Sequence, residues 1–146
     1  MIEIKHFSAC TIFEVYNILQ LRSEVFVVEQ NCVYQDLDSK DLDAFHVIVK
    51  SDVGEIVGTA RILRAGVSYP EVSIGRVCSA KSTRLQGVGK EIMSSAIAFI
   101  EHQWPHVECV ISAQLYLQRF YESLGFIAEG EVYLEDNIPH IQMRRK

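Results

Sequence analysis

Long hydrophobic runs are missing from this sequence, and positive charges are outnumbered by negative ones. No segment approaches the ~20 consecutive apolar residues that a membrane-spanning helix needs. The first eight residues, MIEIKHFS, lack the apolar core of a secretion signal. We therefore expect a cytoplasmic protein with no membrane partner. The net charge of −5 also argues against a nucleic-acid partner, because a basic face supplies most of the affinity for phosphate backbones.

Paired cysteines and clustered metal ligands are missing as well. The four cysteines, Cys10, Cys32, Cys78 and Cys109, include no C-x-x-C pair, and a chain without a secretion signal does not need disulfides. We expect reduced thiols. Because the histidines show no ligand-like spacing with cysteines or acids, we expect no metal site. The length of 146 residues fits a single domain over residues 1–146, as a monomer or a homodimer.

Apolar periodicity divides the chain into strands and helices. Thr11 and Glu14 have capping-box spacing, which predicts that a helix begins there, and Pro105 predicts the end of a long helix. Helices are predicted after residue 11 and over 87–103 and 115–124, a loop or short helix over 30–43, and strands over 2–7, 44–50, 55–64, 71–78, 107–112, 126–128 and 140–143. Consecutive strands followed by alternation favour an α/β (mixed α+β) fold with helices packed on a mixed sheet.

A glycine-rich segment joins the strand over 71–78 to the long helix. Gly87 and Gly89 let the backbone turn tightly and approach a ligand. The start of a helix offers unpaired N–H groups and a partial positive charge, and Arg84 and Lys90 add full charges at either end. The segment therefore predicts a cradle for phosphate groups. It lacks the residues that complete a Walker loop or a dinucleotide fingerprint.

The pattern R-x-x-G-x-G over residues 84–89 resembles the coenzyme A binding motif of the GNAT superfamily of N-acyltransferases. Residues 120–126 match a second segment of that superfamily, F-Y-x-x-x-G-F, at the expected distance. Residues 21–30, 73–77, 112–114 and 133–140 resemble signature segments of the ElaA-like subgroup. The resemblance covers nearly the whole chain. It implies a GNAT-type twisted mixed sheet of six to seven strands with helices on both faces.

The resemblance also implies acetyl-coenzyme A as the acyl donor, with direct attack by an amine on its thioester. The loop that would hold the diphosphate comprises Arg84, Leu85, Gln86, Gly87, Val88, Gly89 and Lys90. The backbone of Arg76, Val77 and Cys78 would bind the pantetheine arm like an added strand, with Gly75 assisting a local distortion. A backbone N–H near Val77 or Cys78 would stabilise charge that develops on the carbonyl oxygen.

Two further side chains have roles implied by the resemblance. Tyr121 occupies the position of the superfamily's general acid, where a phenol can donate a proton to the leaving thiolate. Gln114 stands where many members carry Asn, and it would bind the cofactor arm or brace the adjacent helix. Covalent catalysis by Cys78 is not predicted, because direct transfer needs no nucleophile from the protein.

The sequence leaves the acceptor and the general base open. Candidate bases are Glu29, Asp38, Asp43, His46, Glu71 and His140, while Arg22 and Arg61 could bind an acidic group of the acceptor. The acceptor would be a small-molecule amine, a polyamine or a protein amine. Two alternatives to this enzyme stand: a non-catalytic domain that binds or senses acyl-coenzyme A, and an acyltransferase similar to acyl-homoserine-lactone synthases. The second rests on a distant likeness of residues 22–26 and the acidic run after them.

Overall fold

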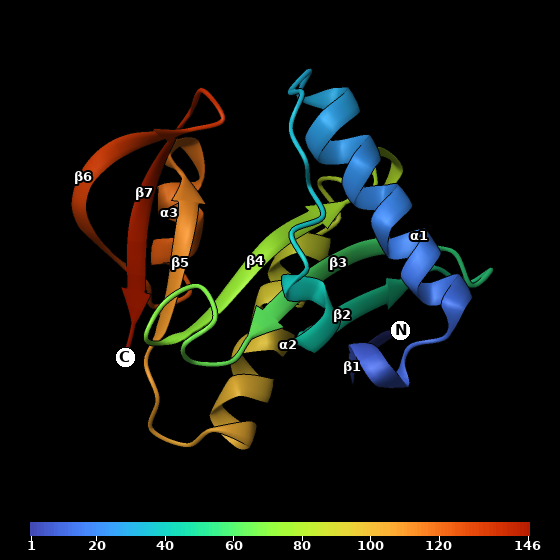
Figure 1. The fold of residues 1–146 in the computed structure, drawn as a ribbon, viewed down its shortest axis with the longest axis horizontal. Helices are drawn as coiled ribbons and strands as arrows, with labels where there is room; N and C mark the ends of the chain where they lie inside the picture. Colours follow the sequence, from blue (N-terminus) through green and yellow to red (C-terminus); the bar gives the residue numbers. More distant parts are fainter.

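One seven-stranded sheet organises the computed structural model, which describes residues 1–146 (Figure 1). Its strands are β1 (Ile2–His6), β2 (Phe45–Lys50), β3 (Ile56–Leu63), β4 (Val72–Ser79), β5 (Cys109–Gln114), β6 (Ile127–Glu135) and β7 (Ile138–Arg145). The α-helices are α1 (Ile12–Arg22), α2 (Val88–Gln103) and α3 (Gln118–Glu122), and short helical turns fill several connections. None of the helices combines the length and the apolar character needed to cross a membrane.

The strand order is β1-β2-β3-β4-β5-β7-β6, and all neighbours are antiparallel except β4 and β5. Helix α1 lies across one face of the sheet, and α2 and α3 pack on the other (Figure 1). The predicted α/β fold, with a mixed sheet of six to seven strands and helices on both faces, is therefore confirmed.

Local signals in the sequence set the ends of the helices. The Thr11 hydroxyl accepts the Glu14 N–H at 3.0 Å and the Glu14 carboxylate accepts the Thr11 N–H at 2.8 Å, so the predicted capping box forms. Helix α2 ends at Gln103, two residues before Pro105. Gly125 adopts φ +94° just after α3, a left-handed conformation that glycine takes without steric cost.

The β6–β7 hairpin is longer than the sequence predicts. Strands were expected only over 126–128 and 140–143, yet β6 reaches Glu135 and β7 begins at Ile138. A register shift between Glu129 and Tyr133, around Gly130 at φ +76°, interrupts the alternation by which a strand is recognised. The tip of the longer hairpin lines the cleft described below.

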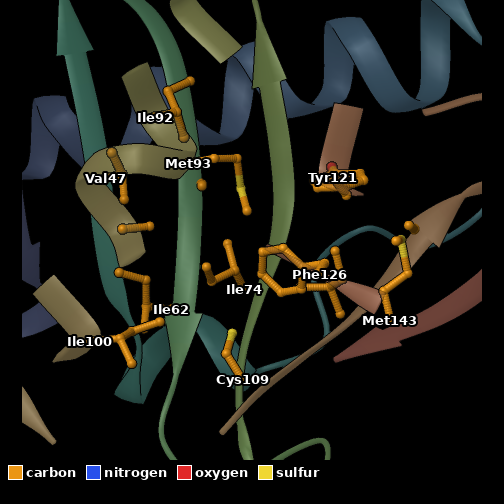
Figure 2. Packing of buried hydrophobic residues seen from close by; sticks show 14 of the residues in the cluster. Val47, Ile62, Ile74, Ile92, Met93, Ile100, Cys109, Tyr121, Phe126 and Met143 are labelled. Carbon is orange, nitrogen blue, oxygen red and sulfur yellow. The ribbon is translucent and has the colours of Figure 1, made fainter. Parts of the chain in front are cut away.

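A cluster of 18 buried hydrophobic residues fills the space between the sheet and α2 and α3 (Figure 2). Strands contribute Val47 and Ile62, α2 contributes Ile92 and Met93, and Met143 closes the cluster from β7. All five side chains are buried completely. At about 1.5–3 kcal/mol for each large apolar side chain, this burial is the main force that fixes α2 against the sheet. The start of α2 is thereby held in a fixed place.

Candidate active site

A cleft of about 850 Å³ opens where β4 and β5 diverge. The two strands pair only at Val72–Cys109 and Ser73–Val110, so their later residues separate instead of continuing the ladder. The cleft is lined by residues from β4 and β5, the 25–40 segment, α3 and the tip of the β6–β7 hairpin. Its volume lies in the range of small-molecule sites. Unpaired backbone along β4 is available to an extended ligand, in the manner of an added strand.

A bulge distorts β4 at the point where it lines the cleft. Against β3, Arg61 pairs with Gly75 and Thr59 pairs with Cys78, so two residues of β4 stand opposite one of β3. Gly75 was expected to take the distortion, but the left-handed residue is Arg76, at φ +52°. This corrects the position of the bulge by one residue. Arg76, Val77 and Cys78 line the cleft beside it.

The start of α2 presents backbone amides that the protein does not use. No side chain caps the helix, and Glu91 is the first residue of this segment whose N–H meets a carbonyl, that of Gly87 at 3.1 Å. Gly87 has φ +78°, and a Cβ added there would meet nothing within 4 Å. A Cβ on Gly89 would meet only Phe120 of α3, at 4.0 Å. The segment has the free donors and the space that a phosphate group needs.

The charged residues of this loop differ in their availability. Arg84 donates to both oxygens of Glu29 at 2.7 Å and to the Ser79 carbonyl at 3.1 Å, so its charge is already neutralised. This corrects the expectation of a free cation at that end of the loop. The hydrogen bond from Arg84 lowers the pKa of Glu29, which makes Glu29 a poor candidate for the general base. Leu85, Gln86 and Lys90 are exposed.

Tyr121 lies in the wall of the cleft, with only 7% of its surface exposed. Its ring packs edge-on against Phe120 and Phe126, at centroid distances of 5.1 Å and 6.1 Å. Burial, with a smaller contribution from Tyr116, raises the pKa of Tyr121 to about 12. The phenol therefore stays protonated at any physiological pH and is a hydrogen-bond donor facing the cleft.

Cys78 and Gln114 also border the cleft, on its two diverging strands. Burial raises the pKa of the Cys78 thiol to about 12, so it carries no thiolate near neutral pH. That argues for a packing role and against a nucleophile. Gln114 is the last residue of β5, opposite His140 of β7 in the antiparallel register. The structure thus brings the predicted pantetheine-binding segment, Gln114, Tyr121 and His140 to one cleft.

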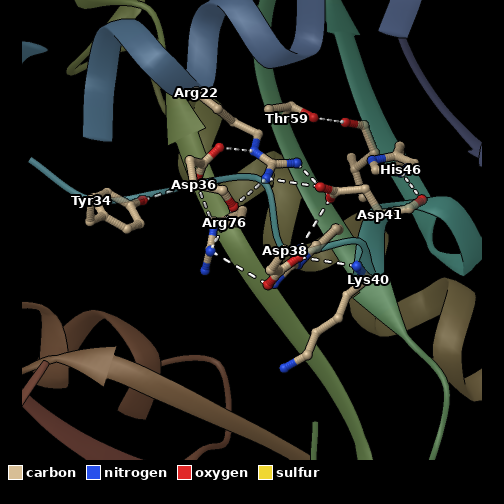
Figure 3. Close-up of polar contacts among 11 residues, drawn as sticks. Arg22, Tyr34, Asp36, Asp38, Lys40, Asp41, His46, Thr59 and Arg76 are labelled. Carbon is tan, nitrogen blue, oxygen red and sulfur yellow. Dashed lines mark hydrogen bonds and ion pairs between the residues drawn. The ribbon is translucent and has the colours of Figure 1, made fainter. Parts of the chain in front are cut away.

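Three predicted acceptor-binding residues lie outside the cleft, and their assignment is corrected. Arg22 is 1% exposed and bonds to Asp36 at 2.9 Å and Asp41 at 2.6 Å (Figure 3). His46 is 3% exposed, and its Nε2 lies 3.1 Å from the Asp41 carbonyl. Glu71, the residue before β4, pairs with Arg144 of β7 at 2.6 Å. None of the three can reach a ligand in the cleft as the side chains stand.

Three other candidates are held by partners in the protein. Arg61 borders the cleft, yet both its terminal nitrogens donate to Asp38 at 2.7 Å. Burial opposes ionisation of Asp38, but the hydrogen bonds from Arg61 outweigh it and hold the pKa of that carboxyl well below its usual range. Asp43 pairs with His6 and Arg64 at the surface. A carboxylate with a strongly lowered pKa is a weak base, so Asp38 is removed from that role.

His140 lines the cleft together with other residues near the tip of the β6–β7 hairpin. Its Nδ1 lies 2.6 Å from the Ile138 carbonyl and therefore donates to it, and its Nε2 lies 3.4 Å from Glu135. The ring stacks on Tyr133, its cross-strand neighbour, whose hydroxyl bonds to Ser112. Glu135 is the last residue of β6. Its place beside His140 follows from cross-strand pairing, which the interrupted alternation of β6 concealed.

The arrangement has counterparts among known proteins. The family model for an acetyltransferase (GNAT) domain matches residues 14–146. The chain belongs to the GNAT acetyltransferase family. The ElaA protein of Escherichia coli strain K12 is 45% identical over 144 residues, which are 97% of this chain and 93% of that protein. The resemblance to the ElaA-like subgroup is thereby confirmed.

Solved structures agree with this GNAT assignment. An acyl-CoA N-acyltransferase from Pseudomonas aeruginosa superposes with a TM-score of 0.94 and 42% identity, covering 100% of this chain and 99% of that one. Escherichia coli ElaA superposes with a TM-score of 0.93, 42% identity and the same coverage. The acyl-homoserine-lactone synthase LasI superposes with a TM-score of 0.78 at 14% identity, over 99% of this chain and 88% of that one, which is a likeness of fold alone.

Proposed function

We propose that this GNAT protein transfers the acetyl group of acetyl-coenzyme A to a primary amine by direct attack. The supporting observation is a cleft lined by the bulged segment of β4 and by Tyr121, with Arg84 of the loop that leads to the unused amides of α2 in the same lining. Phe120, the neighbour of Tyr121, lies 4.0 Å from the position of a Cβ on Gly89, so α3 adjoins the proposed diphosphate cradle. This proximity supports the proposal that the two motifs of the sequence would serve one site.

Donor binding would use backbone groups more than side chains. The amides of residues 87–90 would hold the diphosphate, since they have no acceptor in the protein and stand at the positive end of α2. The bulged segment Arg76–Cys78 would bind the pantetheine arm, and an N–H of Val77 or Cys78 would stabilise charge on the carbonyl oxygen. Tyr121 would donate a proton or a hydrogen bond to the departing sulfur.

His140 is the base that the geometry favours among the candidates. Because Nδ1 donates to the Ile138 carbonyl, the neutral ring carries its lone pair on Nε2. Nε2 and the Glu135 carboxylate, 3.4 Å apart, together present two acceptors to an incoming ammonium group. Glu135 has no Lys or Arg partner, so its charge is available to a cation. His140 would remove the proton that prevents the amine from attacking.

The test is acetyl transfer by the purified protein to a panel of amines, including diamines, amino acids and a lysine peptide. Release of free thiol measures turnover, and calorimetry measures coenzyme A binding separately. We expect turnover on at least one amine, and a loss of turnover in His140→Gln with coenzyme binding retained. The exposed Tyr16→Phe on α1 serves as a control that keeps wild-type rates.

Each alternative predicts a different result in the same assays. Tight coenzyme A binding without turnover on any amine would favour a binding or sensing domain. Preference for a long acyl donor together with S-adenosylmethionine would favour chemistry of the acyl-homoserine-lactone synthase kind. A wild-type protein that binds no coenzyme A would refute the proposed function altogether.

A further inference from the structure

We propose that the ion pair between Arg76 and Asp36 is a positioning device for the transfer reaction. It holds the bulge of β4 in the conformation that directs the peptide groups of residues 76–78 toward the cleft. The inference rests on the proposed function and deepens it, because those peptide groups are the ones assigned to the pantetheine arm and the carbonyl oxygen.

The bulge depends on a backbone conformation that arginine does not favour. Arg76 has φ +52°, in the left-handed region where a side chain is strained. Glycine takes this conformation freely, yet the glycine of this strand is Gly75, one residue earlier and outside that region. The backbone preference of residue 76 therefore works against the bulge. Some other interaction must hold it in place.

The side chain of Arg76 supplies that interaction. Its Nε donates to Asp36 Oδ1 at 2.7 Å and its Nη2 donates to the Asp36 carbonyl at 3.0 Å. Two bonds from one planar guanidinium to one residue fix direction as well as distance. The Tyr34 hydroxyl also donates to Asp36 Oδ1, at 2.9 Å, and the guanidinium lies 5.9 Å from the centre of the Tyr34 ring.

Asp36 is itself anchored to the rest of the fold (Figure 3). It is 5% exposed, and its second oxygen accepts from Arg22 Nε at 2.9 Å. Arg22 donates in turn to Asp41, at 2.6 Å and 3.1 Å, and Asp41 accepts from Arg61 of β3 at 3.2 Å. The network of Arg22, Arg61, Arg76, Asp36, Asp38 and Asp41 thus ties the 30–43 segment to α1, β3 and β4 with balanced charge. Asp36 thus links Arg22, the last residue of α1, to the bulge.

The decisive comparison is Arg76→Ala with Arg76→Gly. Both variants remove the guanidinium and its bonds to Asp36, but only glycine adopts φ +52° without strain. If the side chain acts by holding the backbone, glycine keeps most of the bulge and alanine does not. We expect kcat/KM for acetyl transfer to be at least about tenfold lower in Arg76→Ala than in Arg76→Gly. Asp36→Asn should lower kcat/KM about as much as Arg76→Ala does. In a protein that already carries Arg76→Gly, adding Asp36→Asn should lower kcat/KM little further.

Binding measurements separate positioning from a general loss of structure. Coenzyme A carries the pantetheine arm, whereas ADP carries the diphosphate without it. We expect Arg76→Ala to weaken coenzyme A about tenfold more than Arg76→Gly does, and both variants to bind ADP within about twofold of the wild type. All measurements are made well below the melting temperature of each variant.

Several outcomes would overturn the inference. Equal losses in the alanine and glycine variants would mean that the guanidinium itself acts on a substrate. Wild-type turnover in both would mean that the bulge does not need the ion pair. Equal losses of affinity for coenzyme A and for ADP would mean that Arg76 supports the structure of the whole domain and not the bulge in particular. If the wild-type protein binds coenzyme A and transfers acetyl groups, any of these results in the variants leaves the proposed function intact.

Discussion

Replacement of Gly87 by valine tests the proposed diphosphate cradle most directly. Gly87 has φ +78°, and a Cβ built there meets no atom of the protein within 4 Å. The expected cost to folding is the left-handed strain of a non-glycine residue, about 1–2 kcal/mol, with no clash at the Cβ position. For a domain of this size, each kcal/mol lowers the melting temperature by about 2–4 °C. The variant should fold.

The cost to coenzyme binding should be far larger. The valine side chain would occupy the open space beside the amides of residues 87–90, where no protein atom competes with a ligand. Loss of two hydrogen bonds to a charged phosphate costs roughly 3–6 kcal/mol. The Kd for coenzyme A should therefore rise at least about 100-fold. Calorimetric titration measures this change, and thermal melting measures the change in stability.

Gly54 offers a matched control. It has φ +85° in the turn between β2 and β3, and a Cβ there also meets nothing within 4 Å. Gly54→Val should lose the same stability as Gly87→Val and keep wild-type coenzyme affinity. The reasoning is refuted if Gly87→Val binds coenzyme A within about threefold of the wild type. Equal loss of affinity in both variants would refute it as well.

Three further predictions concern titrating groups. Tyr121→Phe should lower kcat by about 100-fold, within the usual range for a general acid, while the Kd for coenzyme A changes little; wild-type turnover would remove Tyr121 from the mechanism. Since the pKa of Cys78 is raised to about 12, iodoacetamide at pH 8 should leave this thiol unmodified in the native protein, as peptide mapping would reveal. Burial opposes ionisation of Glu14, but the Thr11 N–H and the ammonium groups of Lys50 and Lys5 outweigh it and lower its pKa to about 2. A lowered folded-state pKa contributes stability that is present above the ordinary value of 4.5 and lost as pH falls toward 2, so Glu14→Gln should flatten the pH dependence of unfolding in that window.

The parts of the fold with local signals were predictable from the sequence. The capping box of Thr11 and Glu14 and the stop at Pro105 involve neighbours within a few residues, and both helix ends lie where expected. The bulge in β4 was expected at Gly75 because glycine favours unusual backbone angles. It lies at Arg76 instead, since bonds from a residue 40 positions away, Asp36, decide the conformation there.

The candidate site divides along the same line. Gly87 of the proposed cradle and Tyr121 both belong to short sequence motifs, so they could be identified without knowledge of the fold. The partners of charged residues are long-range choices. Arg84 pairs with Glu29 across 55 positions and Arg22 pairs with Asp41 across 19, so both appeared free in the sequence. The periodicity of the sequence does not predict such pairs, because they form only when distant segments of the chain have packed together in the fold.

The short pairing between β4 and β5 means that the two halves of the sheet are held together mainly by other contacts. Two residue pairs are too few to make the first four strands and the last three a continuous ladder. The hydrophobic cluster spans that gap, with Val47 and Ile62 contributed from one half and Phe126 and Met143 from the other. The width of the opening is therefore governed by the interior. Phe126 belongs to this cluster and does not line the cleft. Replacing it with a smaller side chain would change the separation of the two halves of the sheet, and with it the width of the cleft.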